Sequence, residues 1–331
     1  MASVTGAAGG TRRSSAFDPL SKPPGPAPLG FPSGAGLRYA PPVCGTHGSQ
    51  PPSSVPHFFT VDVEEHFQVS AFEDVVPRST WDSQPTRVVR NTEVLLDLLA
   101  EHSVSGTFFV LGWVAERHPQ LIRRIAAAGH ELASHSWWHF RVNTIDPKTF
   151  REEARRSKAV LEDLSGAPVL GFRAPSFSIT PGTEWAFDLL LEEGYRYDSS
   201  VFPIRRPGYG YPGAPCGPYT IERESGSLLE LPMATLGMGP LRIPAAGGGY
   251  LRQLPFALIR GAFRQAERQG RPGMFYIHPW EIDPDQPRLP VGPVAALRHY
   301  RGLERTAPRL RAMLAEFRFT SVRAWREGHP R

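Results

Sequence analysis

The sequence has few cysteines, few lysines and no long apolar run, and each shortage excludes a class of protein. Its 331 residues include two cysteines, Cys44 and Cys216, without paired or metal-finger spacing. A disulfide scaffold is therefore excluded, and two unpaired thiols in a reducing compartment are expected. No stretch approaches the roughly 18 consecutive apolar residues of a membrane-spanning helix, so no transmembrane segment is predicted.

Lysine occurs only at Lys22, Lys148 and Lys158, so arginine supplies most of the positive charge behind the net charge of +5. The arginines are scattered among acidic residues, and no nucleic-acid-binding motif is present. We therefore expect no nucleic-acid partner.

Residues 1–55 differ from the rest because Pro, Gly and Ser dominate them. Such a composition buries too little apolar surface to offset chain entropy, which predicts a disordered tail. The pair Arg12-Arg13 is followed by a polar stretch where an export signal needs an apolar one. We expect no signal peptide, a cytoplasmic location, and a single folded domain over residues 56–331.

From residue 57 onward, short apolar runs alternate with stretches of helical periodicity. Asp146 is the expected N-cap of a helix that begins at Pro147. Repeated strand-then-helix units predict an α/β fold with a mostly parallel sheet, and active residues at the carboxyl ends of its strands. Strands are predicted at 57–63, 106–110, 131–133, 169–172, 195–198, 228–231, 274–277 and 319–325, and helices at 88–102, 113–128, 147–164, 183–193, 254–269 and 295–317.

Polar residues at two of these strand ends suggest a metal site. Asp62 and Glu64 follow the first strand and point to the same side of an extended chain, although acidic residues there are often merely solvated. His135 and His139, four residues apart, would share one face of a helix; an isolated pair of this kind more often packs in an aromatic cluster. Together with a strand-end carboxylate, two histidines are a recurrent catalytic metal set.

Three more strand ends carry candidates. Arg173 follows the strand at 169–172 and would be costly to bury without a carboxylate partner. His278 closes the strand at 274–277, as a general acid or base would, although a structural core histidine is equally common. Asp198 closes the strand at 195–198 and is predicted to orient His278.

These motifs, in this order, resemble the polysaccharide deacetylase superfamily (NodB homology, carbohydrate esterase family 4). More narrowly, the chain is similar to deacetylases of exopolysaccharide and PEP-CTERM (exosortase) loci. The similarity runs from about residue 58 to 325, and residues 246–250 and 278–287 resemble that subgroup's DUF3473-like C-terminal extension, expected from about residue 205. The resemblance implies a distorted (β/α) barrel of the glycoside hydrolase/deacetylase type.

The resemblance also implies an activity, the metal-dependent hydrolysis of N-acetyl groups on an amino-sugar polysaccharide or its lipid-linked precursor. It further implies a place in exopolysaccharide biosynthesis and association with an assembly complex. The family's first motif usually reads Asp-Asp, whereas this chain has Asp62-Val63-Glu64-Glu65, so Glu65 stays open as an alternative ligand. The implied roles are Asp62 as catalytic base, Glu64, His135 and His139 as ligands of Zn²⁺ or Co²⁺, Arg173 as the residue that orients the base, and His278 as acid, paired with Asp198.

Three other interpretations stay open. A glycosidase would pair Asp62 with Glu281 or Asp283, but it leaves the two histidines and Arg173 without a role. An amidase on the same fold acting on a small molecule is closer. A non-catalytic carbohydrate-binding or scaffold protein is the third, because fold alone does not decide function. Four aromatic residues near the motifs are candidates for stacking on sugar rings: Trp137, Trp138, Tyr250 and Trp280.

Overall fold

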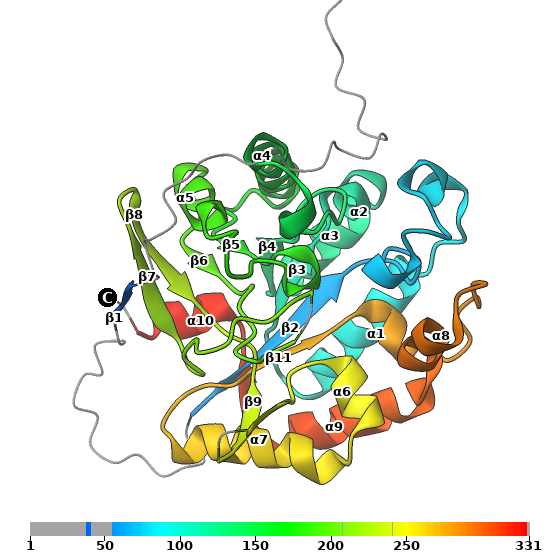
Figure 1. Cartoon of the computed structure of the whole chain (residues 1–331). Helices are drawn as coiled ribbons and strands as arrows, with labels where there is room; N and C mark the ends of the chain where they lie inside the picture. The colour runs from blue at the N-terminus through cyan, green and yellow to red at the C-terminus, as the bar shows by residue number, and fades with distance from the viewer. Residues whose placement is uncertain (1–37, 41–54, 207, 240, 330–331) are drawn as a thin grey trace, which may run out of the picture.

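The computed structural model of the protein describes residues 38–40, 55–206, 208–239 and 241–329. A mostly parallel sheet crosses the molecule and helices surround it, as the sequence predicts (Figure 1). Most of the predicted disordered tail, with Cys44, lies outside the described residues. The structure differs from that prediction at β1 (Arg38–Ala40), whose backbone pairs antiparallel with β7 (Tyr219–Arg223).

The main sheet runs in the order β1-β7-β8-β6-β5-β4-β3-β2-β11, and β12 also pairs with β2. Every pairing from β6–β8 to β2–β11 is parallel, so these strands end at the same edge of the sheet. A separate hairpin joins β9 (Thr235–Met238) to β10 (Leu241–Pro244). The other strands are β2 (His57–Val63), β3 (Thr107–Val110), β4 (Glu131–Ser134), β5 (Gly171–Phe172), β6 (Tyr197–Asp198), β8 (Gly226–Glu230), β11 (Met274–Ile277) and β12 (Phe319–Thr320).

The sheet is not a closed barrel. Met233, which follows β8, forms an isolated parallel bridge with Met274 of β11. The predicted α/β fold class is thus confirmed, with a sheet dominated by parallel strands. The sheet stays open, because a single bridge rather than a ladder joins the segment after β8 to β11.

The helices agree with the predicted periodicity in most places, and none of the described ones is long and apolar enough to cross a membrane. Asp146 caps α4 as predicted, because its Oδ1 accepts from the Thr149 N–H at 2.9 Å. The helices are α1 (Val88–Glu101), α2 (Gly112–Arg117), α3 (Pro119–Ala127), α4 (Pro147–Ser165), α5 (Trp185–Glu192), α6 (Gly248–Gln253), α7 (Phe256–Arg268), α8 (Pro293–Tyr300), α9 (Thr306–Glu316) and α10 (Val322–Glu327).

Three predicted elements need correction. The helix predicted at 113–128 is two helices, because Pro119 has no N–H to donate and begins α3. The helix predicted at 295–317 is divided between α8 and α9 around Gly302, whose φ of 76° is left-handed. The strand predicted at 319–325 stops early, because Ser321 caps α10.

Candidate active site

The predicted site residues lie at the carboxyl ends of neighbouring strands. Asp62 is in β2 and Glu64 follows it, His135 follows β4, and Arg173 follows β5. Asp198 ends β6 and His278 follows β11, while His139 lies in the loop after β4. All are buried except His278, whose side chain is 20% exposed. A parallel sheet places its active residues at this edge.

Three of these side chains form a group suited to a metal ion. One ligand atom from each of Glu64, His135 and His139 lies within 4.8 Å of the other two. His139 Nε2 is 2.9 Å from Glu64 Oε2, yet within the described residues Glu64 Oε2 has no hydrogen-bond partner. His135 Nδ1 lies 2.8 Å from the Arg173 carbonyl, to which it donates in the tautomer that leaves Nε2 free. Two imidazoles and one carboxylate, all buried, are a ligand set that fits a divalent metal ion.

His135 and His139 converge through a loop. The prediction that they share one face of a helix is therefore wrong. Ser136 and His139 have left-handed φ angles of 69° and 56°. Glu153 of α4 holds this backbone, because its Oε2 accepts from Ser136 Oγ at 2.9 Å and from the N–H groups of Trp137 and Trp138 at 3.1 and 2.7 Å. Strained backbone of this kind persists only where the surroundings fix it.

The structure separates the two candidate glutamates. Glu65 caps α1, since its carboxylate accepts from the backbone N–H groups of Arg87 and Val88 at 2.9 to 3.1 Å. Its oxygens are therefore occupied away from the histidines. Of the two alternatives, Glu64 is the one that lies with His135 and His139.

Arg173 has the carboxylate partner that its burial requires. Its Nη1 donates to Asp62 Oδ1 at 2.5 Å and to Thr60 Oγ1 at 2.8 Å. Nε and Nη2 donate to the carbonyl and hydroxyl of Ser199, and the guanidinium carbon lies 4.0 Å from the centre of the Phe109 ring. These contacts fix one oxygen of Asp62 and leave Oδ2 facing His278.

His278 completes the site. Its Nε2 lies 4.0 Å from Asp62 Oδ2 and 3.6 Å from Glu64 Oε1, and its Nδ1 lies 3.0 Å from Glu281 Oε2. The ring therefore faces two carboxylates on one side and a third on the other. Trp280 stacks on the ring at 5.1 Å and donates from Nε1 to Glu64 Oε1 at 3.2 Å.

The structure gives Asp198 partners other than His278. The Asp198 carboxylate accepts from the hydroxyl and the backbone N–H of Ser200, at 2.7 and 2.8 Å. The parallel pairing of β6 with β8 sets Glu230 beside it, and burial raises the pKa of both carboxyl groups. Asp198 thus belongs to a buried carboxyl pair behind Arg173.

Burial and neighbouring charges set the protonation of the site. Burial would raise the pKa of Glu64, but the imidazoles of His139 and His278 lower it to about 2. Burial lowers the pKa of His135 to about 4, so its ring is neutral and able to bind a metal at neutral pH. Burial would also lower the pKa of His278, but Glu64, Glu281 and Asp62 raise it to about 9.

The site also contains Glu153, which the motifs did not indicate, and it gives Trp280 and Glu281 contacts other than those that the sequence suggested for them. Glu153 had a signal in the sequence, because it carries a charge on the buried stripe of α4. Trp137, Trp138 and Trp280 are at most 8% exposed, so they pack inside the protein rather than offering open sugar platforms. Tyr250 is half-buried, with its hydroxyl 2.7 Å from that of Tyr209.

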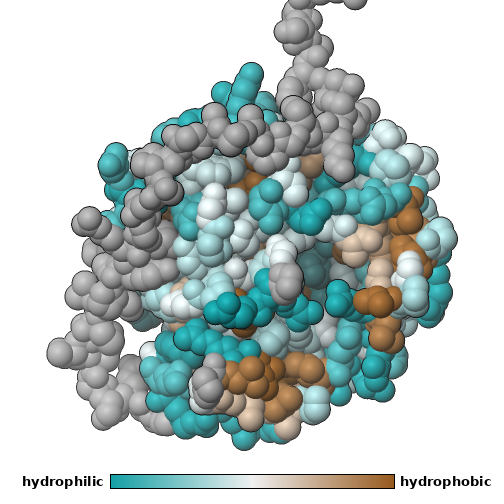
Figure 2. Space-filling model, viewed as in Figure 1, coloured by the Kyte–Doolittle hydropathy of each residue, from teal (hydrophilic) through white to brown (hydrophobic). Residues whose placement is uncertain are grey.

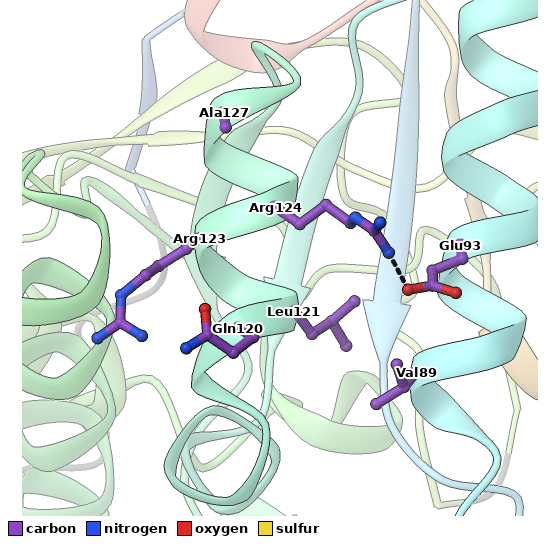
Figure 3. Close-up of a pocket in the computed structure, with 7 residues that line it drawn as sticks. All are labelled: Val89, Glu93, Gln120, Leu121, Arg123, Arg124 and Ala127. Carbon is purple, nitrogen blue, oxygen red and sulfur yellow. Dashed lines mark hydrogen bonds and ion pairs between the residues drawn. The ribbon is translucent and has the colours of Figure 1, made fainter.

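The surface shows two hollows of different character. In Figure 2 the middle of the face viewed in Figure 1 is hollowed, with hydrophilic residues above and below the opening and hydrophobic residues to its right. A second hollow, of about 520 Å³, lies between α1 and α3, where Arg124 and Glu93 pair with each other (Figure 3). None of the predicted site residues lines it; its lining residues are Val89, Glu93, Gln120, Leu121, Arg123, Arg124 and Ala127.

Two family descriptions match the chain. Residues 74–190 match polysaccharide deacetylase, a range that includes His135, His139 and Arg173. Residues 199–327 match a domain of unknown function, DUF3473, which includes His278. Asp62 and Glu64 precede both ranges.

The chain is similar to curated deacetylases over part of their length. A chitooligosaccharide deacetylase of Sinorhizobium fredii is 39% identical over 97 residues, 29% of this chain and 44% of that protein. A peptidoglycan-N-acetylglucosamine deacetylase of Bacillus cereus is 31% identical over 96 residues, 29% of this chain and 34% of that protein. The chain thus spans less than half the length of these relatives.

Solved structures share the fold over most of the chain. A candidate polysaccharide deacetylase from Mycobacterium smegmatis has a TM-score of 0.57 and 25% identity, covering 88% of this chain and 94% of its own. The allantoinase Puue has a TM-score of 0.52 and 19% identity, covering 85% and 93%, and is similar in fold alone.

Proposed function

We propose that this chain, whose residues 74–190 match polysaccharide deacetylase, hydrolyses the N-acetyl groups of an amino-sugar polymer and releases acetate. The observation that carries this proposal is the meeting of Glu64, His135 and His139 with Asp62 and His278 in one buried site. The relatives named for chitooligosaccharide and for peptidoglycan N-acetylglucosamine support a substrate built from N-acetylglucosamine.

Glu64, His135 and His139 are proposed to hold a divalent metal ion, Zn²⁺ first and Co²⁺ as the alternative. When bound, such an ion supplies a Lewis acid that polarises a carbonyl and makes water a nucleophile near neutral pH. The neutral ring of His135 and the ionised carboxylate of Glu64 are the forms that a cation requires.

The protein's own groups handle the protons. Asp62 Oδ2 is free of the Arg173 contact and takes a proton from the attacking water. His278 is protonated at neutral pH and donates from Nε2 to the departing nitrogen, which is otherwise a very poor leaving group. The 4.0 Å between these two atoms puts base and acid beside the same small space. Each transfer contributes roughly 10²–10⁴-fold to the rate.

The glycosidase alternative finds little support in the contacts. The Glu281 carboxylate forms ion pairs with His278 and Arg252. Asp283 Oδ2 accepts from Asn91 at 3.2 Å and from Arg87 at 3.3 Å. Both carboxylates therefore have structural partners. The complete set of base, ligands and acid also argues against a non-catalytic scaffold.

A finer proposal concerns the setting. We propose that residues 56–331 act as one unit with an extension from about residue 205, supported by the separate match of residues 199–327. By resemblance, the substrate is a nascent or lipid-linked saccharide in exopolysaccharide biosynthesis, handled in the cytoplasm beside an assembly complex. Fractionation of native cells tests this, because recovery mainly from the periplasm would contradict it.

The experiment that tests the activity is acetate release from N-acetylglucosamine oligomers, with and without Zn²⁺ or Co²⁺. Wild type and Glu65→Gln are expected to release acetate only with metal, and His135→Ala is expected to release none. Bound metal with no acetate from any oligomer would refute the proposed substrate class, and metal-independent release would refute the metal site.

A further inference from the structure

Glu281 makes an unusual pair of contacts with a single residue. Its Oε2 lies 3.0 Å from Nδ1 of His278 and also accepts the backbone N–H of that residue at 3.2 Å. Glu281 lies three residues after His278, in the short 3-10 helix Pro279–Ile282, and is 1% exposed. One carboxylate oxygen therefore holds both the ring and the main chain of His278.

Arg252 of α6 holds the other oxygen. Its Nε lies 3.2 Å from Glu281 Oε1, and its Nη1 donates to the carbonyl of Arg301 at 2.7 Å. Arg252 is itself buried. A buried carboxylate between a guanidinium and an imidazole has little freedom to turn, because turning would leave a buried charge unpaired.

A glycine makes room for this carboxylate. A Cβ at Gly248 would lie 2.1 Å from Glu281 Oε2, so the carboxylate would have to move from its observed position. A Cβ at the next residue, Gly249, would lie 3.8 Å from Oε1, an ordinary contact. The run Ala246–Tyr250, prominent in the sequence, thus includes one glycine that the position of Glu281 requires and one that it does not.

We infer that Glu281 is the positioning residue of the general acid: by accepting the Nδ1–H of His278 it turns Nε2 toward the space between Asp62 and Glu64. The sequence suggests Asp198 for this task, but Asp198 is bound to Ser200 and Glu230. Gly248, Arg252 and Glu281 all lie in the range that matches a domain of unknown function, so this part of the chain supports the acid. The catalytic half of the inference rests on the proposed function, in which His278 is the acid.

Nuclear magnetic resonance of the full chain, labelled with ¹⁵N-histidine and free of metal, tests the orientation without any turnover. His278→Asn identifies the signals of this ring among the 11 histidines. We expect a hydrogen-bonded, slowly exchanging Nδ1–H in wild type and Gly249→Ala, and its loss in Glu281→Ala and Gly248→Ala. A signal that persists in Glu281→Ala, or is absent from wild type, would overturn the inference.

Kinetics test the consequence. Glu281→Ala and Gly248→Ala should each lower kcat by about 10–100-fold with KM nearly unchanged, as loss of an orienting partner does. Glu281→Gln should recover part of the rate, because its amide oxygen still accepts Nδ1–H, and Gly249→Ala should match wild type. If Glu281→Ala fails to fold, the two glycine variants decide; equal kcat values for them would overturn the inference. A wild type that binds metal but releases no acetate would refute the proposed function instead, and the ring signal would still decide the orientation.

Discussion

The Arg173→Met substitution tests how the base is held. It removes a buried guanidinium that lies 2.5 Å from Asp62 Oδ1 and also bonds to Thr60 and Ser199. Asp62 would remain buried, charged and without that partner, and the acceptors on Thr60 and Ser199 would each lose a donor. The methionine fills much of the volume, so the loss is electrostatic rather than a cavity.

Removing one member of a buried ion pair costs about 3–5 kcal/mol of stability, and for a domain of this size each kcal/mol shifts Tm by about 2–4 °C. We therefore expect Tm to fall by roughly 6–20 °C. Because the cost comes from the stranded charge, neutralising Asp62 in the same chain should recover part of it.

A double-mutant cycle separates this explanation from simple loss of packing. Wild type, Arg173→Met, Asp62→Asn and the double variant are unfolded in urea with excess chelator, so that metal binding does not contribute to the free energy of unfolding. We expect the double variant to be more stable than Arg173→Met, with a coupling of at least about 2 kcal/mol. If the losses in free energy of unfolding of the two single variants add to that of the double variant within about 0.5 kcal/mol, the explanation by a stranded charge is refuted.

Three further predictions follow from the site and the core. Glu64→Gln and His135→Ala should lose bound Zn²⁺, whereas Glu65→Gln should keep it because Glu65 caps α1; equal loss in all three, measured by elemental analysis, would contradict the ligand set. Asp62→Asn and His278→Asn should each lower kcat about 10²–10⁴-fold, and a smaller loss would exclude them as base and acid. Burial lowers the pKa of His57 to about 4. Between about pH 6.5 and 4 the unfolded chain therefore binds a proton on this ring that the folded chain does not. The free energy of unfolding should fall as the pH falls through that window, by up to about 3 kcal/mol. His57→Asn, whose carbonyl can still accept from Gly273, should flatten this dependence in melts from pH 7 to 4, and an unchanged slope would contradict it.

The strand ends of the site can be predicted because a buried parallel strand is a continuous apolar run. The first charged residue or histidine after such a run marks the edge where active residues gather. Phe58 and Phe59 lead in this way to Asp62, and the run at Met274–Ile277 leads to His278. The break at Pro119 was also available from the sequence, because a proline inside a helical pattern ends the helix before it.

The geometry of the two histidines was not available from their spacing. A separation of four residues is typical of a helix, but the loop takes left-handed angles that Glu153 stabilises from a different element, α4. The partner of His278 is non-local for a similar reason. It depends on the pairing of β6 with β8, which occupies Asp198, and on the space that Gly248 leaves for Glu281.

The most direct test of the central claim is mass spectrometry of an N-acetylglucosamine oligomer after incubation with the metal-loaded protein. The account predicts oligomers of unchanged length that have lost acetyl groups. When the metal is removed by chelation, the oligomers should keep all their acetyl groups. Shorter oligomers that keep all their acetyl groups would contradict it and would favour a glycosidase.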